Sequence, residues 1–264
     1  MQLINSSNPC RIVVNFSTFD REKLPNHTFL RCTMKTVPKM SAEAVLENNR
    51  FMIKVYSWMA LALTVTGVVA AWVATVPPLI ETITGSRWVL FGLFLAELVV
   101  VMVMVSTISR ISSSTAVWLF MLYSVLNGLT LSVIFLVFTS ESIALAFYVT
   151  AGTFALMSLV GWVTRTDLTS VGNLLLMALL GLVLASLVNL YFQNETVYWI
   201  STYAGILIFT GLIAYDTQKI RQMNVLGNEG SEADKKESVL GALTLYLDFI
   251  NLFLSFLRIF GKKK

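Results

Sequence analysis

Thiol and imidazole groups are scarce in this sequence of 264 residues, and those present are clustered. Cys10, Cys32 and the single histidine, His27, all lie before residue 50. Two cysteines without further partners make neither a disulfide framework nor a zinc site. Thiol and imidazole chemistry are therefore excluded from the remaining four fifths of the chain.

Charged residues are also few, at 13%, whereas 56% of residues are hydrophobic and the mean hydropathy is +0.74. Such a chain is too apolar for a soluble fold, so we expect an integral membrane protein whose main partner is the lipid bilayer. The formal net charge of +4 gives no reason to expect a nucleic-acid partner.

Seven stretches are apolar enough and long enough, at about 20 residues, to cross a bilayer as helices. They contain no strand-like alternation, which excludes a membrane barrel. We expect an all-α protein of seven transmembrane helices, with spans over residues 55–76, 88–107, 115–138, 142–163, 172–192, 197–218 and 238–260. The one long polar connection is expected over residues 219–237.

The chain divides into two parts by composition. Residues 1–49 are polar and contain no signal-peptide core, so we expect a disordered or weakly helical arm, or an artefact of a start codon upstream of the true one at Met34 or Met40. Residues 50–264 form the seven-helix transmembrane domain.

Basic residues near the span ends predict the orientation, because cytoplasmic loops are rich in Lys and Arg. With a cytoplasmic N-terminus, the outer loops between spans contain only Arg87. The inner loops contain Arg110, Arg165, Lys219, Arg221, Lys235 and Lys236.

The C-terminal tail conflicts with this orientation. Seven crossings would place Arg258 and the three lysines at 262–264 outside. Either the last stretch crosses against its charge or it re-enters and returns to the cytoplasmic face. The full length of the run favours crossing.

The last span contains a carboxylate within an apolar run, "LYLDFINLF". Polar and small residues at steps of three and four share one helix face there: Gly241, Thr244, Asp248, Asn251 and Ser255. A charge at the membrane centre costs about 2.5 to 3.5 kcal/mol on insertion scales, so this face should point into the bundle. The structural alternative is an Asp248 that only hydrogen-bonds a neighbouring helix.

Other spans contribute polar groups as well. Asp216 ends the sixth span, Glu97 lies midway along the second, and Asn189 in the fifth follows a stripe of small residues suited to close packing. The third span adds Tyr123, Asn127 and Thr130 on one face. We interpret these groups as the lining of a common pathway or ion site rather than as a structural network.

Carboxylate, amide and hydroxyl oxygens suit hard cations such as calcium, or protons, rather than transition metals. Two carboxylates brought close in a low dielectric cannot both stay ionised cheaply, so they would share a proton and titrate as a unit. Lowering the pH would then remove their attraction for a basic partner. Arg110 is the best such partner in the sequence, although a topological anchor in the headgroups is an equal interpretation.

An enzyme is not expected, and neither is a bound cofactor. No nucleophile, base and orienting group can be assembled, and no glycine-rich phosphate loop is present. An intramembrane aspartyl protease would need glycine beside each catalytic aspartate, and Asp216 and Asp248 lack it.

Two strings on consecutive spans carry a family resemblance: "AYDTQKI" (214–220) and "LGALTLYLDFINLFLSFLRIFG" (240–261). With "FMLYSVLNGLTLSVIF" (120–135) and "NLLLMALLGLVLASLVN" (173–189), they resemble bacterial members of the transmembrane Bax inhibitor motif family. The similarity extends over all seven spans from about residue 50.

The resemblance implies six helices around a central seventh and a pH-dependent calcium leak in a bacterial inner membrane. By position, Asp216 and Asp248 match the family's di-aspartyl pH sensor, where calcium would bind transiently, and Arg110 matches its latch. Glu97 matches an acidic cavity-lining position.

The family also includes regulators of a membrane-embedded ATP-dependent protease. The alternative function is therefore a non-conducting protein that modulates such a protease or a stress response, with the arm and loops as the binding surface.

Overall fold

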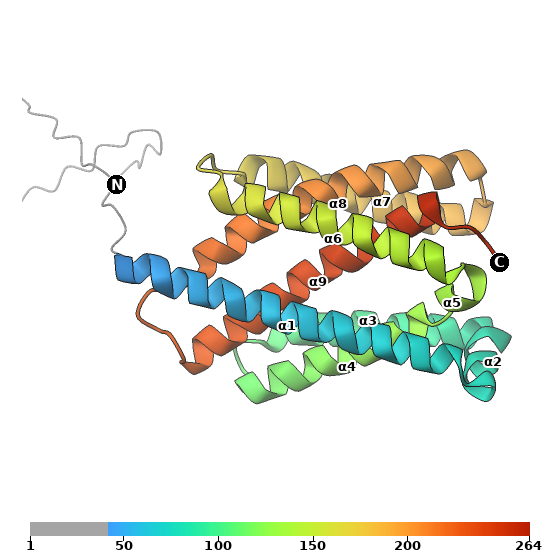
Figure 1. The fold of residues 1–264 in the computed structure, drawn as a ribbon, viewed down its shortest axis with the longest axis horizontal. Coiled ribbons are helices and arrows are strands. Elements are labelled where there is room, and N and C mark those ends of the chain that lie inside the picture. Colours follow the sequence, from blue (N-terminus) through green and yellow to red (C-terminus); the bar gives the residue numbers. More distant parts are fainter. Residues whose placement is uncertain (1–41) are drawn as a thin grey trace, which may run out of the picture. The chain divides into compact units, whose positions relative to one another are not determined.

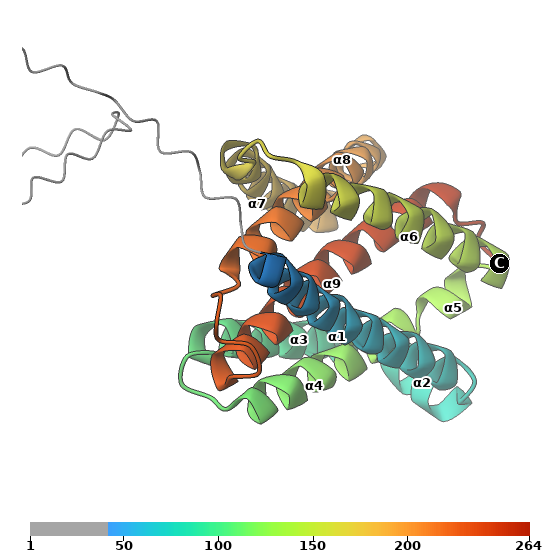
Figure 2. The ribbon, with the colours of Figure 1, turned by 60° about the vertical axis from the view of Figure 1, so that its left-hand side comes forward.

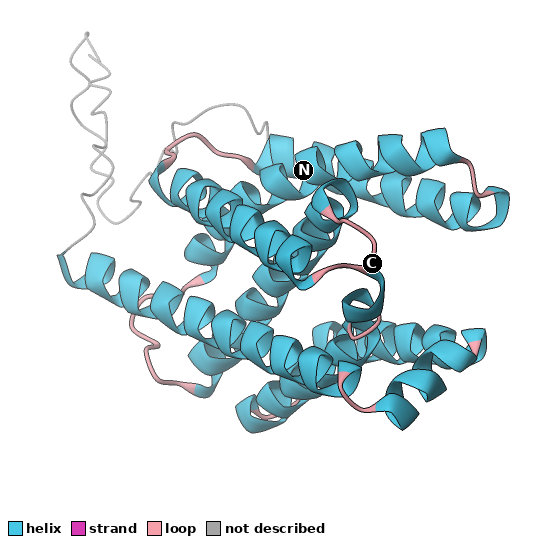
Figure 3. Ribbon diagram, turned by 45° about the vertical axis from the view of Figure 1, so that its right-hand side comes forward, coloured by secondary structure: helices cyan, strands magenta, loops and turns pink. Residues whose placement is uncertain are grey.

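The computed structural model describes residues 42–264, and its regular structure there is helical throughout, without strands (Figure 3). The expected arm therefore lies outside the described residues except for its last eight positions. These are helical, because the first helix begins at Ala42.

The described residues contain nine helices, in the order shown in Figure 1. Two short ones, α2 (Pro77–Gly85) and α5 (Ile134–Val137), connect longer neighbours. The long helices are α1 (Ala42–Ala74), α3 (Arg87–Thr107), α4 (Ser113–Leu131), α6 (Ser140–Val163), α7 (Thr169–Phe192), α8 (Glu195–Met223) and α9 (Glu232–Phe260).

The seven predicted spans are confirmed, since the described chain has seven helical stretches long and apolar enough to cross a membrane. The predicted connection at residues 219–237 was too long. Helix α8 continues to Met223 and α9 starts at Glu232, which leaves a loop of residues 224–231. Gly227 and Gly230 adopt φ values of 89° and 80° in this loop, a conformation that favours glycine.

Polar residues set the starts of four helices. Ser112, Thr139, Asn194 and Ser231 each accept a hydrogen bond from a backbone N–H in the first turn that follows. These N-caps satisfy donors that have no partner within the helix. Helix α2 instead begins with two prolines, whose fixed φ suits a first turn.

Helix α9 is the core of the bundle. In its most apolar window 67% of residues are buried, against 11% in α3 and 6% in α7. It lies between α6, α7 and α8 on one side and α1, α3 and α4 on the other (Figures 1 and 2). It packs closely against α1, α4, α6 and α8, whereas α3 packs on α4 and α7 packs on α8. The expected central helix is thus present, with four close neighbours and two helices further out.

The last helix crosses the bundle completely, as the length of its run predicted. The tail after α9 lies against the α5–α6 connection, where Thr139 N–H donates to the Lys262 carbonyl (3.1 Å) and Lys264 N–H donates to the Val137 carbonyl (2.9 Å). We call this the tail end of the bundle. The opposite end, with the start of α1, residues 108–112 and the loop 224–231, is the Arg110 end (Figure 1).

At the Arg110 end, ionic contacts fix the start of α9. Lys54 on α1 lies 2.7 Å from Asp234, whose side chain is 2% exposed. Glu232 accepts hydrogen bonds from both the backbone N–H and the hydroxyl of Ser113, at 2.9 Å each, which ties α9 to the start of α4.

Replacing Lys54 by methionine should lower the free energy of unfolding by about 2 kcal/mol, because it leaves the buried Asp234 carboxylate without its cation. The figure is below that for a fully buried pair, because the Lys54 side chain is 34% exposed. Arg50→Gln is the matched control: the Arg50–Glu229 pair is 64% and 37% exposed, and its loss should cost less than about 1 kcal/mol. Thermal denaturation of the detergent-solubilised protein measures both. Equal losses of stability in the two variants would contradict the larger contribution that we assign to the Lys54–Asp234 pair.

Candidate functional site

Asp216 and Asp248 face one another across the α8–α9 interface. Their carboxyl groups are close enough to interact, and both residues are buried in helices that cross the bundle and line the same cavity. A carboxylate can only accept, so a hydrogen bond between two carboxyls requires that one carries a proton. The Oδ2 atom of Asp248 has no hydrogen-bond partner among the described residues.

Two glycines allow the neighbouring helices to pack closely against α8 next to this pair. A Cβ atom added at Gly161 on α6 would collide with the backbone of Ala214, and one added at Gly172 on α7 would collide with the ring of Tyr215. Both contacts lie within two residues of Asp216. Helices α6 and α7 therefore approach α8 closely at the level of the pair, as small residues permit in membrane bundles.

The aspartate pair borders a cavity of about 570 Å³, which we call the acidic cavity. Helices α3, α4, α7, α8 and α9 all contribute to its wall, which is largely apolar. The polar side chains that line it are Glu97, Tyr123, Asp216, Lys219, Thr244, Asp248 and Asn251. The structure thus brings together three carboxylates from three different helices, as the sequence predicted.

Glu97 is held by α4. Thr130 donates to its Oε1 at 2.5 Å, and Asn127 donates to its Oε2 at 3.4 Å. Asn127 also donates to the Tyr123 hydroxyl at 3.5 Å, and its own Oδ1 is buried without a partner in the described chain. The predicted polar face of the third span therefore serves mainly to position Glu97 at the cavity.

The predicted polar face of α9 is only partly at this cavity. Thr244 and Asn251 line it, and each donates to a backbone carbonyl one turn back along α9. Ser255 does not line it. It is buried at the interface with α8, where its hydroxyl would contact a Cβ added at Gly205.

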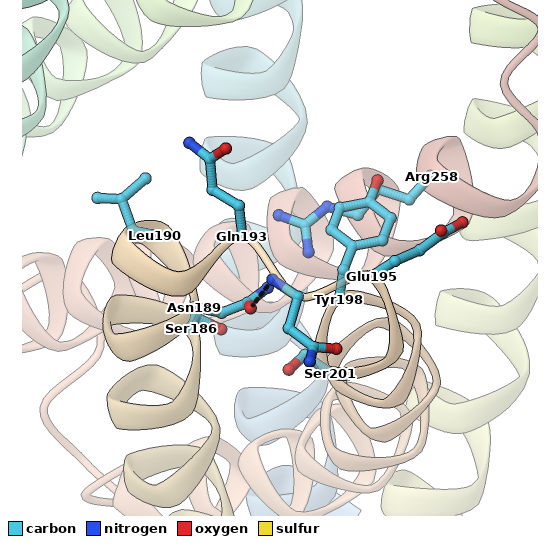
Figure 4. A pocket seen from close by; sticks show the side chains of 9 residues that line it. Ser186, Asn189, Leu190, Gln193, Glu195, Tyr198, Ser201 and Arg258 are labelled. Carbon is cyan, nitrogen blue, oxygen red and sulfur yellow. Dashed lines mark hydrogen bonds between the residues drawn. The ribbon is translucent and has the colours of Figure 1, made fainter.

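Asn189 lies in the last turn of α7, at the tail end of the bundle and away from the aspartate pair. Its Oδ1 accepts a hydrogen bond from Asn194 N–H (2.8 Å), which closes the turn between α7 and α8 (Figure 4). It lines a separate pocket, in which the Arg258 guanidinium lies over the Tyr198 ring. Asn189 is therefore a turn-forming residue and not part of the acidic cavity.

Arg110, the predicted latch, is exposed in the turn after α3. Its side chain makes no hydrogen bond or ion pair with residues 42–264, and it does not line the acidic cavity. Its role in gating remains a prediction.

The model of the family described as "Inhibitor of apoptosis-promoting Bax1" matches residues 48–264. The chain belongs to the Bax inhibitor family. It is 48% identical over 215 residues to the inner membrane protein YbhL of Escherichia coli K12, covering 81% of this chain and 92% of that protein. It is 41% identical over 217 residues to the uncharacterized protein RP147 of Rickettsia prowazekii, covering 82% and 91%. An uncharacterized protein of Borreliella burgdorferi is 38% identical over 222 residues, covering 84% and 96%.

Sequence reasoning missed a cation beside the pair in this Bax inhibitor family member. Lys219 lines the acidic cavity three residues after Asp216, one helical turn away on α8. Its ammonium lies 5.6 Å from the centre of the Tyr215 ring. The sequence placed it in a solvent loop, and the i, i+3 spacing from Asp216 was the signal that could have found it.

A hydroxyl pair deep in the bundle was also missed. The Tyr246 hydroxyl on α9 lies 2.7 Å from the Thr66 hydroxyl on α1, and the Tyr246 ring contacts the ring of Tyr123 edge to face. Because Tyr123 lines the cavity and accepts from Asn127, the Glu97 cluster is connected through it to α9 and α1.

The site is not arranged as a resident metal centre. Among residues 42–264, no group of three or more His, Cys, Asp or Glu side chains could hold a metal ion. Bound calcium takes six to eight oxygen ligands. The cavity offers carboxylate, amide and hydroxyl oxygens from α3, α4, α8 and α9.

Proposed function

We propose that this protein is a pH-sensitive calcium leak whose gate is the Asp216–Asp248 pair. The observation that carries the proposal is the contact between the two buried carboxyls at the wall of a cavity that also holds Glu97. Intramembrane carboxylates are costly, and they commonly mark ion and proton pathways.

The chemistry of the cavity supports calcium as the permeant ion. Its polar lining is dominated by oxygen atoms, which hard divalent cations prefer. During passage calcium would displace the protons of the aspartate pair and bind it transiently, and Glu97 would add a further oxygen ligand toward α3. Proton binding and calcium passage thus involve the same carboxyls.

The sign of the pH dependence follows from the charge of the pair. With one shared proton the pair carries a single negative charge, which attracts the Lys219 ammonium at the same cavity. A second proton removes that charge and with it the attraction, which loosens the α8 turn that carries Lys219. Calcium flux should therefore rise as the pH falls from 8 to 6.

We place the protein in a bacterial inner membrane, as the name of its relative YbhL states for that protein. The Arg110 end would face the cytoplasm, because it carries most of the loop Arg and Lys residues.

Calcium flux into proteoliposomes that contain the purified full chain tests this function. We expect flux above that of protein-free vesicles, with the larger rate at the lower pH. Flux equal to that of protein-free vesicles at every pH from 6 to 8 would overturn the proposal.

Substitutions of Lys219 and of Arg110 are expected to have different effects in the same assay. Lys219→Gln removes the cation at the cavity, so it should raise calcium flux at pH 8 toward the rate at pH 6. Arg110→Gln removes an exposed cation of the same charge at the same end of the bundle and should leave the flux at both pH values within about twofold of wild type, since its field is screened by solvent. If Arg110→Gln alone raises flux at pH 8, the latch function belongs to Arg110.

A further inference from the structure

We propose a second binding site, for a phospholipid with an anionic headgroup, at the Arg110 end between α1, α6 and α8. The headgroup would occupy a polar cavity at the end of α6, and an acyl chain would follow a groove between α1 and α6. This site does not overlap the acidic cavity, and the inference does not depend on calcium flux.

The polar cavity has a volume of about 710 Å³ and contains two arginines, Arg165 and Arg221. Arg221 is fixed, because it donates to the Trp162 carbonyl and its guanidinium lies 5.3 Å from the centre of the Trp162 ring. Arg165 is exposed in the α6–α7 loop, and its side chain has no hydrogen-bond or ion-pair partner in the described part of the chain. Basic pockets between membrane helices commonly bind phospholipid headgroups, and arginine suits phosphate oxygens.

A buried amide gives a second, independent indication of a ligand. Asn48 on α1 lines the same cavity, the residue is only 7% exposed, and its Oδ1 has no hydrogen-bond partner among residues 42–264. Buried acceptors without a donor are costly. A headgroup that combines a phosphate with hydroxyl donors, as in phosphatidylglycerol, would pair with the arginines and bring donors next to Asn48.

The cavity also contains one carboxylate, Asp167. Hydrogen bonds from the hydroxyl (2.6 Å) and backbone N–H (2.9 Å) of Thr169 hold the pKa of Asp167 below its ordinary value, so this group is ionised at neutral pH. Two guanidinium charges and one carboxylate leave a net charge of +1. The site therefore favours a singly charged phosphodiester over a headgroup with several negative charges.

The groove that would take the acyl chain begins where the polar cavity ends. It has a volume of about 570 Å³, is lined by apolar side chains of α1 and α6 such as Ile53, Phe154 and Ala155, and shares Trp162 with the polar cavity. Tryptophan is enriched at the level of lipid headgroups. The polar cavity and the apolar groove meet at Trp162, and they match the polar and apolar halves of a phospholipid at a membrane surface.

Native mass spectrometry of the purified full chain in detergent tests the site. The protein is titrated with phosphatidylglycerol and with phosphatidylcholine of the same acyl chains. We expect phosphatidylglycerol to bind more tightly, and Arg165→Gln to weaken its binding about fivefold, the effect of one basic residue at a lipid surface. Ala155→Trp should weaken the binding of both lipids, because it fills the groove.

Arg110→Gln is the matched control, since it removes an exposed arginine at the same end that lines neither the cavity nor the groove, and it should bind as wild type. Inorganic phosphate distinguishes a lipid site from a free-anion site and should not displace phosphatidylglycerol at equal concentration. The proposal is overturned if Arg165→Gln and Ala155→Trp both bind phosphatidylglycerol as wild type does, or if inorganic phosphate displaces it.

Discussion

Replacing either Asp216 or Asp248 by asparagine is expected to abolish the pH dependence of calcium flux. Asparagine cannot release a proton, so the remaining carboxyl loses the partner with which it shares one. The ratio of the rates at pH 6 and pH 8 should fall to about one in each variant, because a coupled pair titrates as a unit. Proteoliposome flux with a calcium indicator measures the ratio.

Two comparisons sharpen this prediction. The double variant should change the ratio no further than either single variant, because residues in direct contact are not additive. Glu141→Gln, the matching amide substitution at an exposed carboxylate that lines neither cavity, should keep the wild-type ratio. A wild-type ratio in both Asp216→Asn and Asp248→Asn would remove the pair from the gate.

Gly161→Leu is expected to have the largest effect on folding. A side chain at this position meets the backbone of Ala214, which cannot move aside without displacing α8. Overpacking of this kind costs typically 1 to 3 kcal/mol, and we expect about 3 kcal/mol because the obstacle is main chain. The fraction of monodisperse protein that remains after heating in detergent, measured by size-exclusion chromatography, reports the loss.

Gly152→Leu is the matched control on the same helix. A Cβ at Gly152 meets no atom of the described chain within 4 Å, so this substitution should leave thermal survival unchanged or slightly improved, since leucine is the better helix former. If both variants survive heating equally well, the close contact between α6 and α8 does not determine stability.

The sequence was sufficient to predict the three carboxylates at the cavity. Asp248, Asp216 and Glu97 each lie in an apolar helix, where a carboxylate has to face the protein interior. That constraint comes from the membrane and applies to each helix separately, so it needs no knowledge of how the helices pack. The sequence could not show that Asp216 and Asp248 lie next to each other, because this depends on the register between α8 and α9.

Asn189 shows where a pattern within one helix is insufficient. Its stripe of small residues predicted close packing, yet a Cβ at Gly181 on that stripe would meet no atom of the described chain within 4 Å. Lipid tails are as apolar as leucine side chains, so hydrophobicity does not determine which face of a membrane helix is buried. Helix α7 consequently lies at the periphery, and Asn189 forms a turn.

Lys219 was missed for a different reason. Hydropathy falls after residue 218, and the charged residues that follow resemble a loop. Helix α8 nevertheless continues to Met223, because Gln218 hydrogen-bonds the α6–α7 loop at Thr166 (2.8 Å) and Arg221 contacts Trp162. These tertiary contacts stabilise a polar turn of helix that hydropathy alone would end.

The shared proton is the central claim, and infrared difference spectroscopy of the protonated carboxyl C=O stretch tests it most directly. Glu97→Gln serves as the background, so that the remaining intramembrane carboxyl signal belongs to the pair. We predict a protonated-carboxyl band that grows as the pH falls from 8 to 6 and that changes with pH no longer when either Asp216 or Asp248 is replaced by asparagine. A band that is absent throughout this range, or that still titrates as in the wild type in both asparagine variants, would contradict a gate built on this pair.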